Sequence, residues 1–121
     1  MTRTVQRGEV WAVDFEPQTH RQEPGNKERP ALVIQTDALN KASHSTTIVV
    51  PGTSQVDALP PGDHFPLRVR IQRTADLKYD TDLLVDQVRA ISNARFMFHY
   101  CTVPSNLMKR VEDALRLLTA R

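Results

Sequence analysis

The C-terminal end of the chain carries one clear helical pattern. Leu107, Val111, Leu115 and Leu118 recur at spacings of four, four and three residues, which places them on one face of an α-helix. Ser105 stands at the start of this segment and can cap its first turn. Everything before it consists of short strand-like segments and polar connections, so the sequence predicts one long helix packed against a sheet.

Six short segments before this helix favour β-strands. They are rich in β-branched residues or alternate apolar and polar positions, and polar, proline or glycine residues separate them. The segments are residues 8–15, 31–35, 46–50, 65–71, 83–91 and 99–103. Alternation in the fourth segment directs Arg68 and Arg70 outward, and Pro66 suits a strand start or an edge. Asp37 can cap a short helical turn over residues 38–41.

These elements predict the fold class. We expect an α+β protein with a small, strongly curved or barrel-like antiparallel sheet and a C-terminal α-helix. The length of 121 residues suits one compact domain over residues 1–121. The first strand, residues 8–15, has apolar side chains on both faces, so we expect it to be covered on both sides.

Charge and composition exclude several classes of protein. The net charge is +2, from 16 Lys and Arg against 14 Asp and Glu, so a nucleic-acid site depends on local clustering of charge. The single Cys101 cannot form an intrachain disulfide and is typical of a small buried thiol. No apolar run reaches the roughly 18 residues of a spanning helix, and residues 1–7 lack a signal-peptide apolar region. We expect a soluble, cytoplasmic protein without membrane contact.

An arginine stands directly before a proline at the start of the apolar segment Arg29–Ile34. Proline restricts its predecessor to extended conformations, so we expect Arg29 at the strand entrance with its guanidinium pointing outward. Thr53 and Ser54, just after residues 46–50, can offer hydroxyls beside it. A guanidinium can bind two phosphate oxygens and stays protonated, which makes it a poor general base. The alternative is a surface arginine paired with Glu28 or another carboxylate.

The order of several motifs resembles the MazF/PemK toxin family. These motifs are Arg7-Gly8-Glu9-Val10-Trp11, Arg29-Pro30-Ala31-Leu32-Val33-Ile34 with Asp37 and Asn40, Thr53-Ser54-Gln55, residues 84–91, and Val111-Glu112-Asp113-Ala114-Leu115. The resemblance implies an SH3-like barrel sheet and the toxin component of a type II toxin-antitoxin system. It also implies an endoribonuclease that cuts single-stranded RNA, mRNA included, at selected sequences. Cleavage would proceed without metal or cofactor, by 2′-hydroxyl attack, and would leave a 2′,3′-cyclic phosphate.

The resemblance implies roles for particular residues. Arg29 and Thr53 correspond to the catalytic pair, with the arginine in proton transfer and the threonine stabilising the phosphate. Ser54 and Gln55 then become substrate contacts. Glu23 is the nearest counterpart of a family glutamate that could accept the proton of the attacking hydroxyl. The alignment there needs an insertion, and Glu28 remains an alternative.

The polar loop of residues 16–28 directly precedes Arg29 and is well placed to cover a site. Its Lys27, Arg21 and His20 could meet RNA phosphates, although charge-rich loops are more often only solvated. Trp11 is either a core or rim aromatic or, where its indole is partly exposed, a surface on which a base can stack.

Histidines offer a rival chemistry, because two of them can act as acid and base in phosphodiester cleavage. His20, His44, His64 and His99 have no recognisable spacing, and one cysteine without a His-x-x-x-His pair supports a metal site poorly. We therefore expect neither metal nor other cofactor.

The resemblance also implies partners. Family members form twofold homodimers, and residues 84–91 with the segment Asn93–Phe98 are the candidate for part of that contact. Phe96, Met97 and Phe98 stand in a row and cannot all face one core. The alternative is that they close the end of a monomeric barrel. A cognate antitoxin is expected to place an acidic, disordered segment in the basic groove.

Two other functions remain open from the sequence. One is a non-catalytic toxin of the same fold that binds a protein such as DNA gyrase, because a fold does not determine a function. The other is a binding-only RNA module, in which the arginine holds phosphate but the rewritten loop has lost the proton acceptor.

Overall fold

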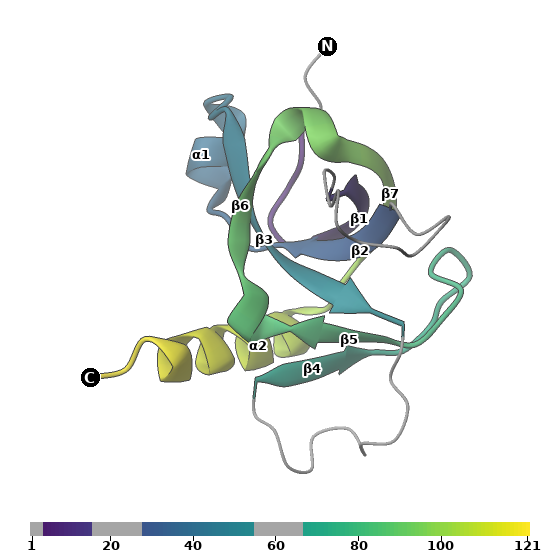
Figure 1. Cartoon of the computed structure of the whole chain (residues 1–121), viewed down its shortest axis with the longest axis vertical. Helices are drawn as coiled ribbons and strands as arrows, with labels where there is room; N and C mark the ends of the chain where they lie inside the picture. The colour runs from purple at the N-terminus through teal and green to yellow at the C-terminus, as the bar shows by residue number, and fades with distance from the viewer. Residues whose placement is uncertain (1–3, 16–27, 55–66) are drawn as a thin grey trace, which may run out of the picture.

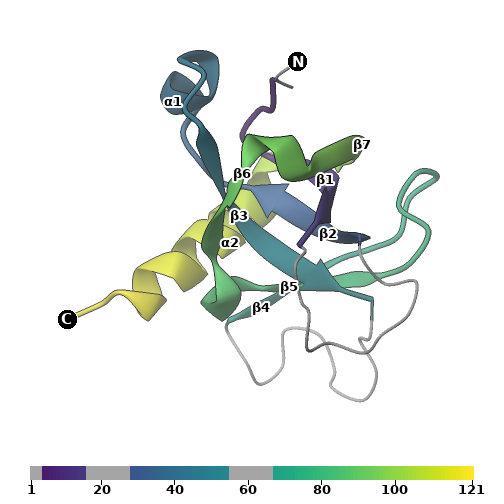
Figure 2. The ribbon, with the colours of Figure 1, turned by 45° about the horizontal axis from the view of Figure 1, so that its top comes forward.

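The computed structural model describes residues 4–15, 28–54 and 67–121, which form a strongly curled antiparallel sheet with a C-terminal helix (Figures 1 and 2). In chain order the elements are β1 (Glu9–Asp14), β2 (Glu28–Val33), α1 (Asp37–Lys41), β3 (Thr46–Thr53), β4 (Arg68–Ile71), β5 (Thr81–Leu84), the 3-10 helix η1 (Val85–Gln87), β6 (Arg89–Ser92), the 3-10 helix η2 (Asn93–Arg95), β7 (Phe96–Thr102) and α2 (Ser105–Leu118). The expected fold class is confirmed.

β3 organises the sheet. The strand order is β4-β5-β3-β2-β1-β7, and β6 pairs with β3 beside this path. Residues 46–49 of β3 pair with β6, whereas Gly52 and Thr53 pair with β5, and β2 lies along the other edge. Because β3 changes partner along its length, the sheet bends around it. Figure 1 shows β6 and β7 curling over β1, with β4 and β5 on the other side of the bend.

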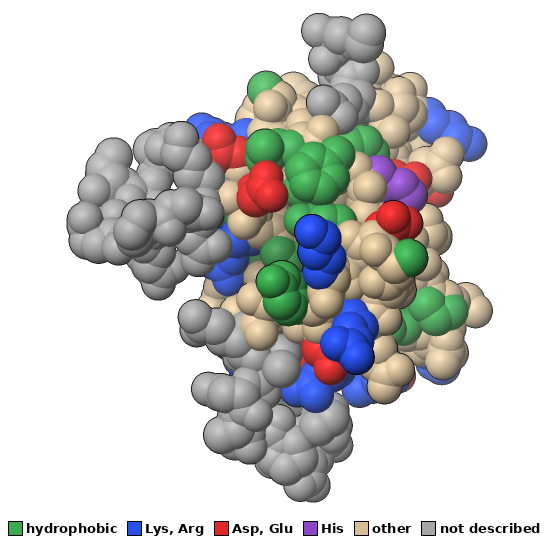
Figure 3. Space-filling view, turned by 90° about the vertical axis from the view of Figure 1, so that its right-hand side faces the viewer, with side chains coloured by type: hydrophobic (Ala, Val, Ile, Leu, Met, Phe, Trp, Pro, Cys, Tyr) green, Lys and Arg blue, Asp and Glu red, His purple; other side chains and the backbone are tan. Residues whose placement is uncertain are grey.

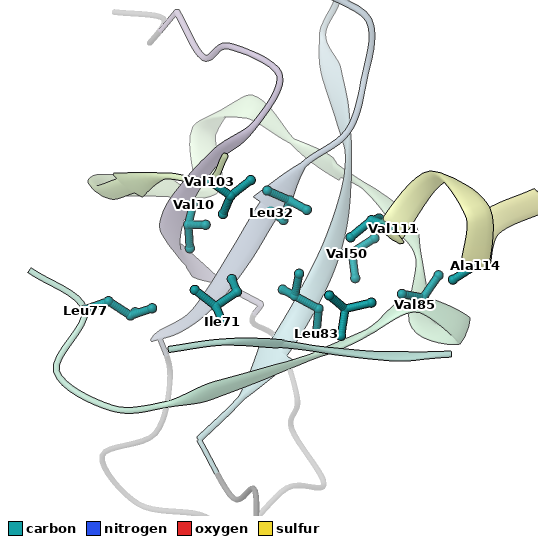
Figure 4. Packing of buried hydrophobic residues seen from close by; sticks show 11 residues of the cluster. Val10, Leu32, Val50, Ile71, Leu77, Leu83, Val85, Val103, Val111 and Ala114 are labelled. Atoms are coloured by element: carbon teal, nitrogen blue, oxygen red, sulfur yellow. The ribbon is translucent and has the colours of Figure 1, made fainter. Parts of the chain in front are cut away.

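One face of the sheet packs against α2 through the larger buried cluster (Figure 4). Its members are Val10, Leu32, Val50, Val69, Ile71, Leu77, Leu83, Val85, Val103, Val111 and Ala114. Leu107 and Leu115 of α2 are partly buried against this cluster. The predicted apolar stripe is therefore right up to Leu115. It is wrong at Leu118, which is exposed, since Ala114 faces the core instead.

The other face of the sheet, inside the curl, holds a second buried cluster. Its members are Val5, Trp11, Val13, Phe15, Ala31, Val33, Val49, Ile91 and Phe96. β1 contributes Val10 to the first cluster and Trp11 and Val13 to the second, because successive side chains of a strand point to opposite faces. The expectation that the first strand is covered on both sides is confirmed.

The segment 83–91 is not one strand, contrary to expectation. β5 ends at Leu84, η1 turns the chain, and β6 begins at Arg89. The turn is needed because β5 pairs with the end of β3 and β6 with its beginning. β3 in turn runs three residues beyond the expected Val50, since β5 extends its ladder to Thr53.

Both predicted helix caps are displaced by one residue. Thr36 caps α1, and its hydroxyl accepts a hydrogen bond from the Ala38 amide at 3.4 Å. Asp37 is the first helical residue. Pro104 precedes α2 as its N-cap without a side-chain hydrogen bond, so Ser105 is the first residue of the helix. A cap has extended rather than helical backbone angles, which the residue types alone do not reveal.

Two smaller expectations concern Cys101 and membranes. Cys101 is half-buried on β7 rather than fully buried as expected, and burial raises the pKa of its thiol. In the described ranges no helix has the length and apolar character to cross a membrane.

Candidate functional site

Arg29 lies near the start of β2, on the same face as Ala31 and Val33. Its Nη2 donates a hydrogen bond to the carbonyl oxygen of Gly52 at 3.1 Å. The half-buried Arg29 side chain therefore contacts the end of β3, whereas the sequence predicts a guanidinium that points outward. Pro30, which follows it, keeps the backbone of Arg29 extended.

Gly52 allows three strands to meet closely at this point. A Cβ atom there would lie 2.6 Å from Thr81 Cγ2, 3.4 Å from the Asp82 carbonyl oxygen and 3.5 Å from Pro30 Cγ. The first distance is shorter than real Cβ contacts, so with any side chain at this position Thr81 or the strand that carries it would have to shift. The Pro51-Gly52 pair is thus buried strand, whereas the sequence also allowed a solvated turn.

A row of cross-strand neighbours crosses the sheet beside this contact. β4 pairs Arg70 with Asp82 of β5, and β5 pairs Asp82 with Thr53 of β3. The β2–β3 register, continued by two residues past its paired positions, sets Arg29 opposite Thr53. Directly opposed residues of antiparallel strands point to the same face. The row therefore places these four side chains on one face, with Arg29 and Thr53 together as expected.

Asp82 and its two arginines are not among the site residues that the sequence singles out. The Asp82 carboxylate accepts from Arg70 Nε at 2.8 Å and from Arg70 Nη2 at 3.4 Å, and Arg68 Nη1 lies 3.7 Å from its Oδ2. The side chain of Asp82 is 6% exposed. As expected, Arg68 and Arg70 alternate with the buried Val69 and Ile71, and both are half-buried at this ion pair. The signal was an aspartate directly before the predicted strand of residues 83–91, because a buried carboxylate needs a cation.

Ser54 is the other expected hydroxyl, and Glu28 is the alternative proton acceptor. Ser54 is exposed and follows the last residue of β3, next to Thr53 in the chain. Glu28 is exposed and alternates with Arg29 on β2, so it faces the other side of the sheet. Burial, and less strongly the charge of Glu28, raise the pKa of Tyr100, which packs against the cluster on the α2 side. Glu28 is therefore a poor proton acceptor for the Arg29–Thr53 face.

Trp11 belongs to the core. It is 8% exposed, its ring contacts Phe96 edge-on at 5.7 Å between centroids, and its Nε1 donates to Glu9 Oε1 at 2.8 Å. A ring buried in this way offers little surface on which a base could stack. Of the two interpretations drawn from the sequence, the structure favours the core aromatic.

Several predicted residues lie outside the described residues. They are Glu23, Lys27 and Gln55, together with His20, Arg21 and His64. Of the other two histidines, His44 is exposed, and His99 Nε2 lies 4.0 Å from Glu9 Oε2. Within the described ranges no group of three or more His, Cys, Asp or Glu side chains could hold a metal ion.

On the side shown in Figure 3, Lys and Arg side chains lie in several places, with acidic and hydrophobic side chains between them. The expectation that a nucleic-acid contact depends on local clustering of charge stays a prediction.

Comparison with known proteins decides the family. A family model described as PemK-like, MazF-like toxin of type II toxin-antitoxin system matches residues 6–119. The chain belongs to this family. Among relatives of this MazF-like chain, endoribonuclease EndoA of Bacillus subtilis (strain 168) is 30% identical over 117 residues, which cover 96% of this chain and 95% of EndoA. The resemblance inferred from the motifs is confirmed.

Solved structures of MazF-like proteins share the fold. MazF from Deinococcus radiodurans superposes with a TM-score of 0.73 at 22% identity, over 98% of this chain and 99% of that one. An endoribonuclease from a mycobacterial species, in complex with its cognate antitoxin, superposes with a TM-score of 0.64 at 16% identity, over 94% and 91%. These likenesses support the curled sheet with its C-terminal helix.

Proposed function

We propose that this MazF-like chain is the toxin of a type II toxin-antitoxin system and a sequence-selective endoribonuclease that cuts single-stranded RNA, mRNA included, without a metal ion. The family match over residues 6–119 and the 30% identity to endoribonuclease EndoA support the activity. The observation that carries the mechanism is the placement of Arg29 against Gly52, opposite Thr53, on one face of the sheet.

The reaction joins the 2′-oxygen of a ribose to the adjacent phosphorus and breaks the bond from phosphorus to the 5′-oxygen of the next nucleotide. The products are a 2′,3′-cyclic phosphate and a 5′-hydroxyl. A base must take the proton of the 2′-hydroxyl, and the leaving 5′-oxygen must gain one. Extra negative charge develops on the non-bridging phosphate oxygens, and donors that already point at them lower the barrier.

Arg29 and Thr53 suit two of these steps, which are the stabilisation of the phosphate charge and the protonation of the leaving 5′-oxygen. Arg29, tethered by its bond to Gly52, can donate to the phosphate oxygens and supply a proton toward the leaving oxygen. The Thr53 hydroxyl can donate to the same phosphate. A protonated guanidinium cannot accept the 2′-hydroxyl proton, and Glu28 faces the opposite side of the sheet. Glu23 therefore stays the proposed proton acceptor.

The proposed substrate contacts surround this pair. Ser54 directly follows Thr53, and Gln55 and Lys27 complete the set. A flexible single strand lets the 2′-oxygen, the phosphorus and the leaving oxygen align, and it exposes base edges that a protein can read. Trp11 is left out of this set, since its ring is packed in the core against Phe96.

The proposed assembly is a cytoplasmic, single-domain toxin that forms a homodimer and is neutralised by a cognate antitoxin. Phe96 is buried, whereas Met97 and Phe98 are exposed on β7, so part of this apolar row is available for a contact between copies. An acidic antitoxin segment would compete with RNA for the arginines of the row.

Incubation of the purified chain with a mixed pool of long RNA in EDTA tests the activity. We expect discrete cuts, with ends mapped to one short sequence. Arg29→Ala and Thr53→Ala should each abolish cutting while circular dichroism and the elution volume stay those of the wild type. Arg110→Ala, an exposed arginine of α2, is the matched control and should cut normally. Wild-type cutting by Arg29→Ala would remove the mechanism.

The same assay separates the other two functions. RNA that is retained but not cut would favour a binding module. Neither retention nor cutting would favour a toxin that acts on a protein such as DNA gyrase.

A further inference from the structure

We propose that Tyr79, in the loop of residues 72–80 that joins β4 to β5 (the β4–β5 loop), stacks on an unpaired base of the RNA near the phosphate that is cut. This inference rests on the proposed function, because it takes single-stranded RNA as the substrate and places the scissile phosphate at Arg29 and Thr53. It adds a contact to a base, whereas the roles proposed for Arg29 and Thr53 concern the phosphate.

The β4–β5 loop lies at the same end of the sheet as the proposed site. Ile71, the last residue of β4, pairs with Thr81, the first residue of β5, and the next residue, Asp82, pairs with Thr53. Figures 1 and 2 both show the loop projecting from the side of the sheet at which β2 begins and β3 ends. Tyr79 precedes Asp82 by three residues, which is roughly 10 Å along an extended chain. A flexible strand of RNA held at Thr53 can therefore reach the loop.

Hydrogen bonds within the β4–β5 loop fix its middle. The Thr74 hydroxyl accepts hydrogen bonds from the amides of Asp76 at 3.2 Å and Leu77 at 3.0 Å, and the Thr74 amide donates to the Leu77 carbonyl oxygen at 2.8 Å. Leu77 is 4% exposed and packs in the buried cluster on the α2 side of the sheet. The loop is thus anchored to the core, so little conformational entropy is lost there when a ligand binds.

Two further hydrogen bonds hold the backbone at Tyr79. The Arg73 amide donates to Asp80 Oδ1 at 2.9 Å across the base of the loop, and the Thr81 hydroxyl donates to the carbonyl oxygen of Tyr79 at 3.1 Å. Neither bond involves the tyrosine ring. The backbone therefore positions the ring, and the ring itself stays at the surface.

Tyr79 is the most exposed of the large hydrophobic and aromatic residues in the described ranges. It is 67% exposed, compared with 44% for Phe98 and 8% for Trp11. A base can stack only on a ring whose face is accessible, and a tyrosine on an ordered backbone has few torsions left to immobilise. Among the described aromatic residues, Tyr79 meets this requirement best.

The formal charges of the β4–β5 loop balance. Arg73 and Lys78 carry two positive charges, and Asp76 and Asp80 carry two negative ones. The loop as a whole therefore does not attract phosphate, and it does not favour an acidic protein segment either. Single-stranded RNA exposes the uncharged aromatic faces of its bases to protein side chains. Stacking on a base is the interaction that an exposed ring in a neutral loop can offer.

The first test measures RNA binding without cleavage. The probe is a single-stranded RNA whose sequence is selected from a mixed pool for binding to the wild-type chain, and whose riboses all carry 2′-O-methyl groups so that no 2′-hydroxyl can attack. Tyr79→Ala should bind it roughly five- to hundredfold more weakly, the range for one lost stack. Tyr79→Phe keeps the ring and should bind within about twofold of the wild type. Leu117→Ala, at an exposed apolar position of α2, is the matched control and should bind normally.

The dependence of affinity on salt separates stacking from charge. A lost stack releases no counterions, so the slope of log affinity against log salt should be the same for Tyr79→Ala and for the wild type. A slope that falls by about 0.7 in Tyr79→Ala would indicate a lost phosphate contact and would overturn the stacking role.

Abasic probes identify the stacked base. In this set of probes, one nucleotide at a time lacks its base while the sugar-phosphate backbone stays intact. At the position that stacks on Tyr79, the wild type and Tyr79→Ala should bind with equal affinity, because the ring has no base to contact. If Tyr79→Ala stays weaker by the same factor with every abasic probe, stacking of the ring on a base is contradicted.

The outcomes distinguish this inference from the proposed function. A wild type that cuts RNA, together with a Tyr79→Ala variant that binds as tightly as the wild type, would overturn the role of Tyr79 alone. A wild type that binds the probe but does not cut natural RNA, with weaker binding by Tyr79→Ala, would support Tyr79 and overturn the proposed activity. A wild type that neither binds nor cuts RNA would overturn both.

Discussion

At the scale of single residues, Gly52 decides whether the site exists. It accepts the hydrogen bond from Arg29, and its missing side chain lets β5 approach so that Thr53 lies opposite Asp82. The sequence shows a glycine after a proline, which is equally typical of a turn. Only the neighbouring strands show that this position must lack a side chain because β5 packs against it, and not because the backbone adopts a glycine-only conformation.

Gly52→Ala tests this. The added methyl group would lie 2.6 Å from Thr81 Cγ2, so β5 must shift, at a cost of about 1–3 kcal/mol in the free energy of unfolding. RNA cleavage by Gly52→Ala should fall by more than the loss of folded protein explains, because Thr53 and Asp82 move apart.

Gly8→Ala is the control variant. Its φ of +96° makes the substitution strained, and no atom within 4 Å has to be displaced, so it should destabilise the chain without a specific loss of activity. Equal activity losses in the two variants, once corrected for the folded fraction, would contradict the account. Urea unfolding and RNA cleavage measure both.

At the scale of elements, the sequence predicts most strands and the C-terminal helix correctly, because alternation and helical spacing are local signals. It misses the break between β5 and β6 and the last three residues of β3, since both arise from the change of partner along β3. Arg29 and Thr53 were singled out through their motifs, and their roles are proposals. Asp82 was not, because an ion pair between strands depends on a register that the residue types do not specify.

The start of α1 gives a prediction at this scale. A hydrogen bond from the Arg7 amide and, next, one from the Asn40 side chain hold the pKa of Asp37 below its usual range. A lowered pKa stabilises the fold above the ordinary carboxyl pKa of about 3.9, and this stability is lost as the pH falls through the lower folded value. Asp37→Asn should therefore lower the free energy of unfolding at pH 7, by up to about 1 kcal/mol because solvent screens a charge near the surface.

Thermal unfolding of Asp37→Asn and of the wild type between pH 7 and pH 3 checks this. The difference in stability should narrow as the pH falls below about 4. A constant difference across that range would show that the carboxylate charge does not stabilise the link between Arg7 and α1.

At the scale of the whole molecule, one curled sheet separates two cores, and the cluster on the α2 side ties β1, β2, β3, β4 and β5 to the helix (Figure 4). Leu32 is fully buried in its middle. Leu32→Ala should lower the free energy of unfolding by about 2–5 kcal/mol, through lost burial and the cavity left behind. Leu117→Ala, at an exposed position of α2, should change it by less than about 0.5 kcal/mol. Chemical denaturation of both variants compares them, and equal losses would contradict this assignment of the core.

The site spans the same sheet, since its row takes residues from β2, β3, β5 and β4. Its geometry thus depends on the curl as a whole rather than on one loop. We propose that Arg29 and Thr53 in this row promote attack by the 2′-oxygen of the RNA itself.

The most direct measurement uses an RNA that contains the mapped cleavage sequence with a single 2′-deoxy nucleotide on the 5′ side of the cut. The wild-type protein is incubated with this RNA and with the unmodified RNA in EDTA. The account predicts cleavage of the unmodified RNA to a 2′,3′-cyclic phosphate and none at the deoxy position, with binding retained. Cleavage at the deoxy position would contradict it.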